Sequence, residues 1–206
     1  LLERTVEASL AADGSLQAKI REVATGASAS ANRALYKGMT EPQYRRVIER
    51  WVISSASSAQ VSEIAVNAAE PGFELDLEMS APGYAQSMAG RLLVFKPAVV
   101  ARRGGLHWDD DERVYPITLH SDALAETTRL KLPAGFAIDE QPPDVRVEET
   151  FGAYEASWKA EGDELVFQRK LVLRNAEVPA EDYASLREFF NAIVAAEVSP
   201  VVLLKQ

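Results

Sequence analysis

The sequence predicts a mainly β fold with helices, of the α+β class, made of antiparallel β-sandwich-like domains that each pack one or two helices. Runs of alternating apolar and polar residues recur along the chain, and residues 73–80 form the clearest of them. Turn sequences that contain Gly or Pro separate these runs. Two other segments, from Glu41 and from Ala180, carry apolar residues at three- and four-residue spacing, which is typical of amphipathic helices.

The first half of the chain predicts a hairpin, two helices and further strands. Asp13-Gly14 lies between alternating residues 1–10 and 16–24, which favours a β-hairpin. Gly38 suits the end of a helix over 29–37, and Thr40 suits the N-cap of the next one. Strands over 61–66, 73–80 and 92–95 should follow. We therefore expect a β-rich domain over 1–107 with a helical insertion at about 27–55.

The second half predicts a smaller domain over 108–206. Arg102–Gly105 and Asp109–Glu112 read as a surface linker, so we place the boundary near residue 108. Strands are expected over 114–119, 127–132, 145–147, 154–158 and 165–173. A helix at about 180–195 and a final strand from Val201 complete a small β-sandwich-like unit.

Composition excludes several function classes. The 206 residues include 31 acidic and 22 basic side chains, so the formal net charge of −9 disfavours nucleic acid and anionic membranes as partners. No apolar stretch is long enough to span a bilayer. The absence of cysteine excludes thiol nucleophiles, disulfides and thiolate metal sites. Because the chain starts at Leu1 without a Met or a leader pattern, we expect it to be a piece of a longer protein, with any targeting signal upstream.

Two acidic groups are candidates for cation or proton chemistry. Asp109-Asp110-Asp111-Glu112 lies close to His107, but consecutive acids point apart and no Gly turns the loop as a calcium site requires, which favours a solvated linker. Whether Asp109–Asp111 bind a cation stays open at this stage. Glu74, Asp76 and Glu78 share one strand face, and their alternation with apolar residues favours a solvent-exposed face over an acid–base pair.

Histidine, aromatic and basic residues give only weak signals. A hydrolase using His107 or His120 would need a nucleophile nearby, and no Gly-x-Ser-x-Gly elbow is present. An aromatic platform would make the chain a carbohydrate- or cell-envelope-binding module, although one aromatic stripe is more often core. Its rings would be Phe151, Tyr154, Trp158 and Phe167. The basic residues Arg45, Arg46 and Arg50 are expected to be solvated or ion-paired. We predict no catalytic, cofactor-binding or metal-binding residue and no cofactor.

Five short motifs in the second half carry a family resemblance. They are Arg113–Ile117, Leu132–Phe136, Phe151–Tyr154, Pro179–Tyr183 and Phe189–Ile193, in this order. The sequence resembles the C-terminal domain of unknown function that follows the catalytic core in bacterial transglutaminase-like multidomain proteins. The first half is similar to the stretch just after that core, through Asp13-Gly14, Thr25-Gly26, Arg33, the helix from Glu41, Pro71 and the segment Tyr84 to Pro97.

The resemblance implies a non-catalytic accessory module of an exported protein. Its partner would be the upstream transglutaminase-like domain of the same chain, which it would pack against or orient, and a protein or peptide is a further partner. Such a core uses a Cys–His–Asp arrangement, so none of the family's catalytic residues maps onto this cysteine-free sequence. The resemblance also implies a periplasmic or extracellular location in the envelope of a Gram-negative-type bacterium.

Overall fold

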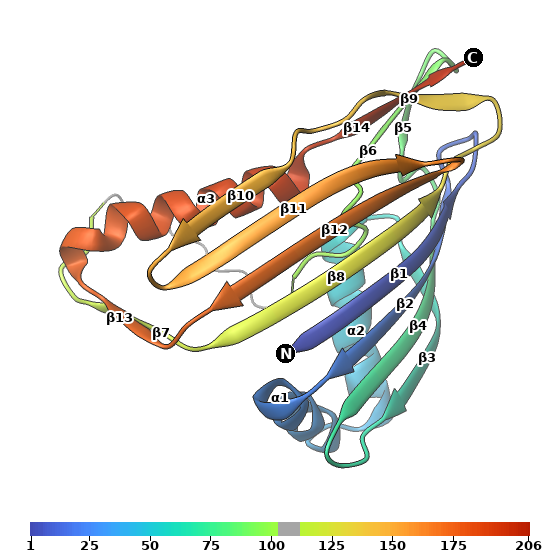
Figure 1. Ribbon diagram of the computed structural model, residues 1–206. Coiled ribbons are helices and arrows are strands. Elements are labelled where there is room, and N and C mark those ends of the chain that lie inside the picture. The colour runs from blue at the N-terminus through green and yellow to red at the C-terminus, as the bar shows by residue number, and fades with distance from the viewer. Residues whose placement is uncertain (103–111) are drawn as a thin grey trace.

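A large twisted β-sheet dominates the computed structural model, which describes residues 1–102 and 112–206 (Figure 1). Its eight strands lie in the order β10-β11-β12-β8-β1-β2-β4-β3. Their bounds are β1 (Leu2–Leu10), β2 (Leu16–Ala24), β3 (Gln60–Asn67), β4 (Phe73–Ala81), β8 (Asp122–Lys131), β10 (Val145–Glu149), β11 (Gly152–Glu161) and β12 (Glu164–Leu173). The predicted α+β class, with antiparallel sheets and a few helices, is confirmed.

One pair of strands in this sheet is parallel. β1 runs parallel to β8, with Thr5 opposite Thr127, whereas every other neighbouring pair is antiparallel. This pair joins the strands that precede residue 108 to those that follow it. The expected boundary itself falls within 103–111, outside the described residues, so the two-domain division stays a prediction.

Two smaller sheets extend the fold. β13 (Ala176–Val178) pairs with β7 (Ile117–Leu119). The other sheet has the order β5-β6-β14-β9, with bounds β5 (Gln86–Met88), β6 (Leu92–Phe95), β14 (Val201–Lys205) and β9 (Phe136–Glu140). The C-terminal strand therefore lies between strands from both halves of the sequence. The short strands β5, β9 and β13 were not predicted, because three to five residues carry too little alternation to recognise.

The large sheet buries only one of its faces. Along β4, Phe73, Leu75, Leu77 and Met79 are buried, whereas the intervening acidic residues are only partly covered. The same alternation continues through β1, β2, β8, β11 and β12, because directly opposed residues on neighbouring strands point to the same side. We call this side the covered face and the opposite side the open face.

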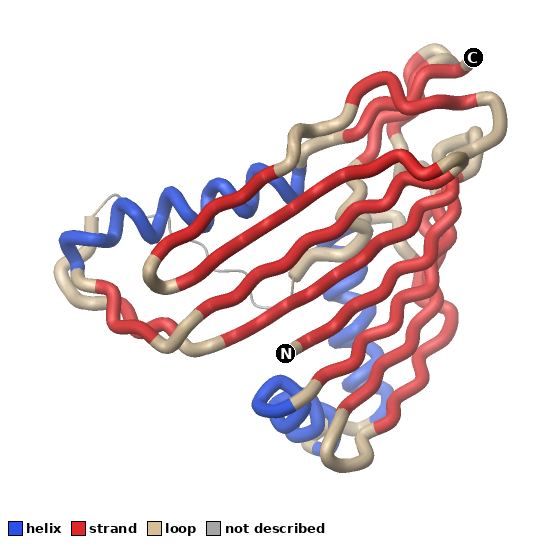
Figure 2. The backbone as a smooth tube through the Cα atoms, viewed as in Figure 1, coloured by secondary structure: helices blue, strands red, loops and turns tan. Residues whose placement is uncertain are grey.

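Three helices pack on the covered face (Figures 1 and 2). They are α1 (Gly26–Lys37), α2 (Glu41–Ser55) and α3 (Tyr183–Val198), the last preceded by the 3-10 turn η1 (Ala180–Asp182). Tyr36 of α1 meets Phe73 of β4, with ring centroids 6.3 Å apart, and Phe189 of α3 meets Phe151, with centroids 5.4 Å apart. None of these helices is long and apolar enough to cross a membrane, within the described residues.

Local sequence explains where several elements begin and end. Pro42 lies in the first turn of α2, and the Gln43 side chain accepts a hydrogen bond from the Thr40 amide at 2.8 Å, which completes a capping box. Gly14 has a φ of +84° in the β1–β2 turn, and Gly162 has a φ of +64° between β11 and β12. The hairpin predicted at Asp13-Gly14 is confirmed, and β11 and β12 form a second hairpin. The strand expected from Thr127 begins five residues earlier, at Asp122, because β1 and β12 pair along its whole length.

Candidate functional site

Charged residues form an unusual row across the covered face. Each of four neighbouring strands places one of them among apolar residues: Glu22 on β2, Arg4 on β1, Glu126 on β8 and Arg169 on β12. The strand register sets them directly opposite one another in this order. Acid and base therefore alternate along the row, and all four residues are at most 3% exposed. We call these four residues the charged row.

Short contacts connect every member of the charged row. Arg4 reaches Glu22 Oε1 through Nε at 2.9 Å and through Nη2 at 2.8 Å. Its Nη1 donates to Glu126 Oε2 at 2.7 Å, and Arg169 Nη2 donates to the same oxygen at 2.7 Å. Thr128, also buried, donates to the other oxygen of Glu126 at 3.3 Å. Charge-assisted bonds of this length compensate much of the cost of removing the ions from water.

Residues 97–102, which we call the strap, lie against the charged row. The Val100 carbonyl accepts a hydrogen bond from Arg169 at 2.8 Å, and the Ala101 carbonyl accepts from Arg4 at 3.4 Å. Arg102 pairs with Glu197 near the end of α3 at 2.7 Å, and Glu197 also lies 3.1 Å from Arg169 Nη1.

Helix α2 holds the strap from its other side. Trp51 donates its indole N–H to the Ala101 carbonyl at 2.9 Å, and Ser55 Oγ accepts from the Ala101 amide at 2.6 Å. The Trp51 ring also receives the Arg4 guanidinium, whose carbon lies 5.1 Å from the ring centroid. The strap thus links α2, α3 and the sheet.

Electrostatic interactions favour the ionised forms of Glu126 and Arg169. Burial alone would raise the pKa of Glu126, but the Arg169 and Arg4 guanidinium groups outweigh it and hold that pKa below its usual value. Burial opposes the charge of Arg169 as well, yet Glu126 and Glu197 raise its pKa. A general acid or base works best with a pKa near the operating pH. The pKa values of Glu126 and Arg169 are moved away from that range and both side chains are buried, so their arrangement suits a structural role.

The open face carries a shallow hollow of about 720 Å³. Its floor contains a cross-strand row of small or uncharged polar residues: Thr5, Thr127, Gln168 and Ser157. Gln168 donates weakly to Thr127 Oγ1 at 3.4 Å. Charged residues of both signs line the hollow's rim: Glu3, Asp144, Arg146, Glu155 and Lys170. Three of these four side chains, Thr5, Thr127 and Ser157, are short, which contributes to the hollow above this part of the sheet.

The acidic side chains of β4 lie on the open face, away from the hollow. Arg21 of β2 contacts Glu74 at 3.0 Å and Asp76 at 2.9 Å, and Lys19 pairs with Glu78. All of these side chains are about one third exposed or more. The prediction that the three acids form a wet face is confirmed, and each carboxylate has a basic partner on the neighbouring strand.

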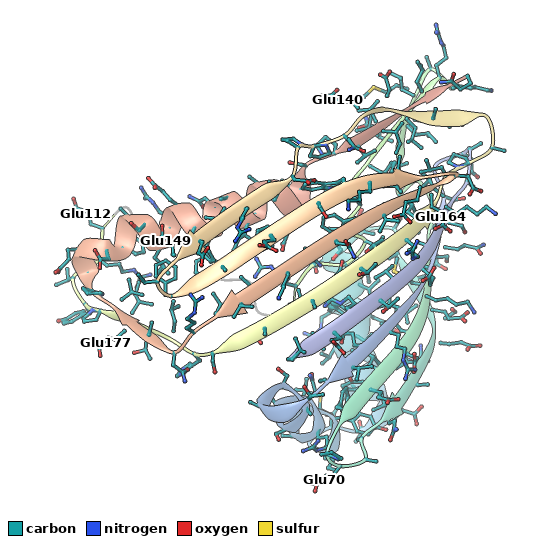
Figure 3. The ribbon with its side chains drawn as sticks, viewed as in Figure 1. Glu70, Glu112, Glu140, Glu149, Glu164 and Glu177 are labelled. Atoms are coloured by element: carbon teal, nitrogen blue, oxygen red, sulfur yellow. The ribbon has the colours of Figure 1, made fainter. Side chains whose placement is uncertain are left out.

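The other acidic and histidine candidates do not form a site among the described residues. His107 and Asp109–Asp111 lie outside those residues, whereas Glu112 and His120 are exposed. Figure 3 labels six glutamates that are spread over separate elements around the molecule: Glu70, Glu112, Glu140, Glu149, Glu164 and Glu177. Across 1–102 and 112–206, no three His, Asp or Glu side chains gather into a group that could hold a metal ion.

The alternative prediction of an exposed aromatic platform is wrong, because all four of its rings are buried. Trp158 is 2% exposed and Tyr154 is fully buried, and Phe151 and Phe167 are buried with them. These rings pack in the core, with the centroids of Trp158 and Phe167 5.4 Å apart, so a sugar cannot stack on them. On α2, Arg45 is ion-paired as predicted: its Nη1 lies 3.7 Å from Glu49 Oε1.

Sequence reasoning missed the charged row. Glu22 lies on the same side of β2 as Leu16, Ala18 and Ile20, but alternation within one strand does not identify its partners on other strands. The alternation of buried residues along each strand is a usable signal. Arg4 lies on the same side of β1 as Val6 and Leu10, and Glu126 lies on the same side of β8 as Leu124 and Leu130. A charge in phase with buried residues needs a buried counter-charge.

Comparison with known proteins identifies a family for the second half of the chain. A search of curated proteins finds no match. The crystal structure of a candidate protease from Parabacteroides distasonis is similar, with a TM-score of 0.49 and 11% identity over 59% of this chain and 24% of that one. The chain thus corresponds to about a quarter of that protein's length. The model of a domain of unknown function with a solved structure, DUF3858, matches residues 91–203, and the chain belongs to this family.

Proposed function

We propose that this chain is a non-catalytic accessory module of an exported, transglutaminase-like protein of the bacterial envelope. It would pack against the catalytic core of that protein or orient it, and a protein or peptide would be a further partner. The proposal rests on the open face, which none of the three helices covers and which contains the hollow floored by Thr5, Thr127, Gln168 and Ser157.

Two further observations support a docking role rather than a chemical one. The charged row is buried and internally paired, which favours a structural role for it over a catalytic one. The five motifs of the second half resemble the region that follows the core in transglutaminase-like proteins. A sheet that is polar on one side and mixed in charge at the rim suits a reversible protein contact more than a permanent apolar interface.

The gene upstream of the codon for Leu1 provides the first test. The proposal expects it to encode a papain-like core with a Cys, a His and an Asp in the same reading frame. An upstream region without such a core would end the assignment to a transglutaminase-like protein.

The docking surface can be tested with Thr127→Arg, which places a long charged side chain on the floor of the hollow. Calorimetry would measure binding of the separately produced core to the chain. We expect wild type to bind, and Thr127→Arg to bind about tenfold more weakly or worse. Gln60→Arg is the matched control, because it adds the same charge at an exposed position of the edge strand β3, outside the hollow. Equal binding by wild type and Thr127→Arg would show that the hollow is not the docking surface.

A further inference from the structure

The charged row crosses the line between the two halves of the sequence. Glu22 and Arg4 come from strands before residue 108, whereas Glu126 and Arg169 come from strands after it. Arg4 and Glu126 are 122 positions apart in the chain, yet they form one of the shortest ion pairs. The parallel β1–β8 pair is therefore bridged by backbone hydrogen bonds and also by buried charges.

The members of the row depend on one another. Glu126 contacts the guanidinium groups of both Arg4 and Arg169. Its loss would leave three connected guanidinium groups, those of Arg4, Arg169 and Arg102, with two carboxylates, those of Glu22 and Glu197. An uncompensated charge in a dry interior is strongly destabilising. The strap depends on the same groups, because its two carbonyls accept hydrogen bonds from Arg4 and Arg169. Separating the two halves would expose the row and release the strap in one step.

We infer that the charged row and the strap act as an interlock, which makes the strands of both halves and the strap open as one cooperative unit. The structure assigns Glu126 the central position, because it contacts both arginines. Two independently stable domains joined by a linker would behave differently, since each would then open with its own free energy.

Native-state hydrogen exchange in increasing denaturant tests the interlock. In the wild-type chain, amides of β1, β2, β8, β12 and the strap should exchange through the same opening and with the same denaturant dependence. Exchange of β1 and β2 through a separate opening, at a different denaturant concentration from β8 and β12, would overturn the inference. This measurement needs no substitution, so it decides the question even if variants fold poorly.

Glu126→Gln tests the central position directly. The unfolding equilibrium constant should rise about a hundredfold or more, with protection lost together on both sides of the β1–β8 pair. Asp76→Asn is the matched control, because it removes a carboxylate from an arginine pair on the open face, where side-chain exposure is 46% for the acid. That change should alter the constant by less than about fivefold.

A milder variant covers the case in which Glu126→Gln does not fold. Glu197→Gln weakens the contacts to Arg102 and Arg169 at a side chain that is 13% exposed. It should speed exchange of the strap together with β1 and β12. Faster exchange confined to α3 would contradict the interlock.

Discussion

A single carboxylate oxygen of Glu126 lies 2.7 Å from a guanidinium nitrogen of Arg4 and 2.7 Å from one of Arg169. The two arginines reach it from opposite neighbours of β8, one parallel and one antiparallel. The buried face of this sheet therefore contains an ionic layer within an otherwise apolar core. That layer constrains the register of β1, β8 and β12, because a shift of one residue would move each charge to the open face.

Acidification should destabilise the fold. The pKa of Glu126 is lower in the folded chain than its ordinary value of 4.5, so the stability it contributes is complete above 4.5 and is lost as the pH falls through the folded pKa. Arg4, Arg169 and Thr128 donate hydrogen bonds to the Glu126 carboxylate, and Tyr84 and Tyr154 also interact with its charge. Urea titrations between pH 7 and pH 3 would measure the free energy of unfolding. A free energy that stays constant or rises on acidification would contradict this expectation.

Gly14→Ala should be one of the more damaging single changes. A Cβ at this position would lie 2.3 Å from the carbonyl oxygen of Ala85, and Gly14 also has a φ of +84°. We expect the loss of stability to exceed the roughly 1–2 kcal/mol typical of a left-handed non-glycine residue without a clash. Gly162→Ala is the control, since Gly162 also has a positive φ but a Cβ added there would meet no atom within 4 Å. Equal midpoints for the two variants in chemical denaturation would show that the Ala85 contact relaxes freely.

Phe189→Ala should weaken the attachment of α3. Phe189 is 1% exposed and packs edge-on against Phe151 and Phe190, with centroids 5.4 and 5.3 Å apart. Removing a buried phenylalanine typically costs about 3–5 kcal/mol. Val194→Ala on the same helix, at a side that is 40% exposed, should change stability by only about 0.5 kcal/mol. Comparable losses for the two variants, measured by denaturant unfolding, would contradict the packing of this helix.

Thr40→Ala should destabilise α2 at its start. The Thr40 hydroxyl and the Gln43 side chain lie 3.0 Å apart in the capping box, and loss of an N-cap costs about 0.5–2 kcal/mol. Thermal unfolding followed by circular dichroism would show a lower midpoint. Arg46→Ala provides the comparison, because Arg46 is exposed on the same helix and Ala favours helix at least as well. A midpoint unchanged by Thr40→Ala would mean that packing alone fixes the start of α2.

Local features of the sequence account for the hairpins and helices. Asp13-Gly14 and Gly162 define two turns, and the spacing of Tyr44, Ile48 and Val52 defines the buried side of α2. The parallel pairing of β1 with β8 has no such local signature, because its register depends on residues more than a hundred positions apart. Asp122–Glu126 was not predicted as strand because its Ala and acidic residues favour other structures, and pairing on both sides overrides that preference.

For the candidate sites too, local patterns predict the faces of single strands but not the contacts between distant strands. Alternation correctly indicated that Glu74, Asp76 and Glu78 face solvent, and the single aromatic stripe correctly suggested core for Trp158. The hollow could not be foreseen, since Thr5 and Thr127 become neighbours only when β1 and β8 pair. Its floor consists of uncharged polar side chains from four strands, none of which is distinctive in its own segment.

The parallel β1–β8 pair also sets an order of events during synthesis. β1 can pair with β2 as soon as the first hairpin has left the ribosome, but its other edge has no partner until β8 is made, more than a hundred residues later. Loop closure over that distance is slow, and such topologies have high contact order. Until then the nascent chain presents an open strand edge that carries Arg4 without Glu126, which is a state that favours aggregation or chaperone binding.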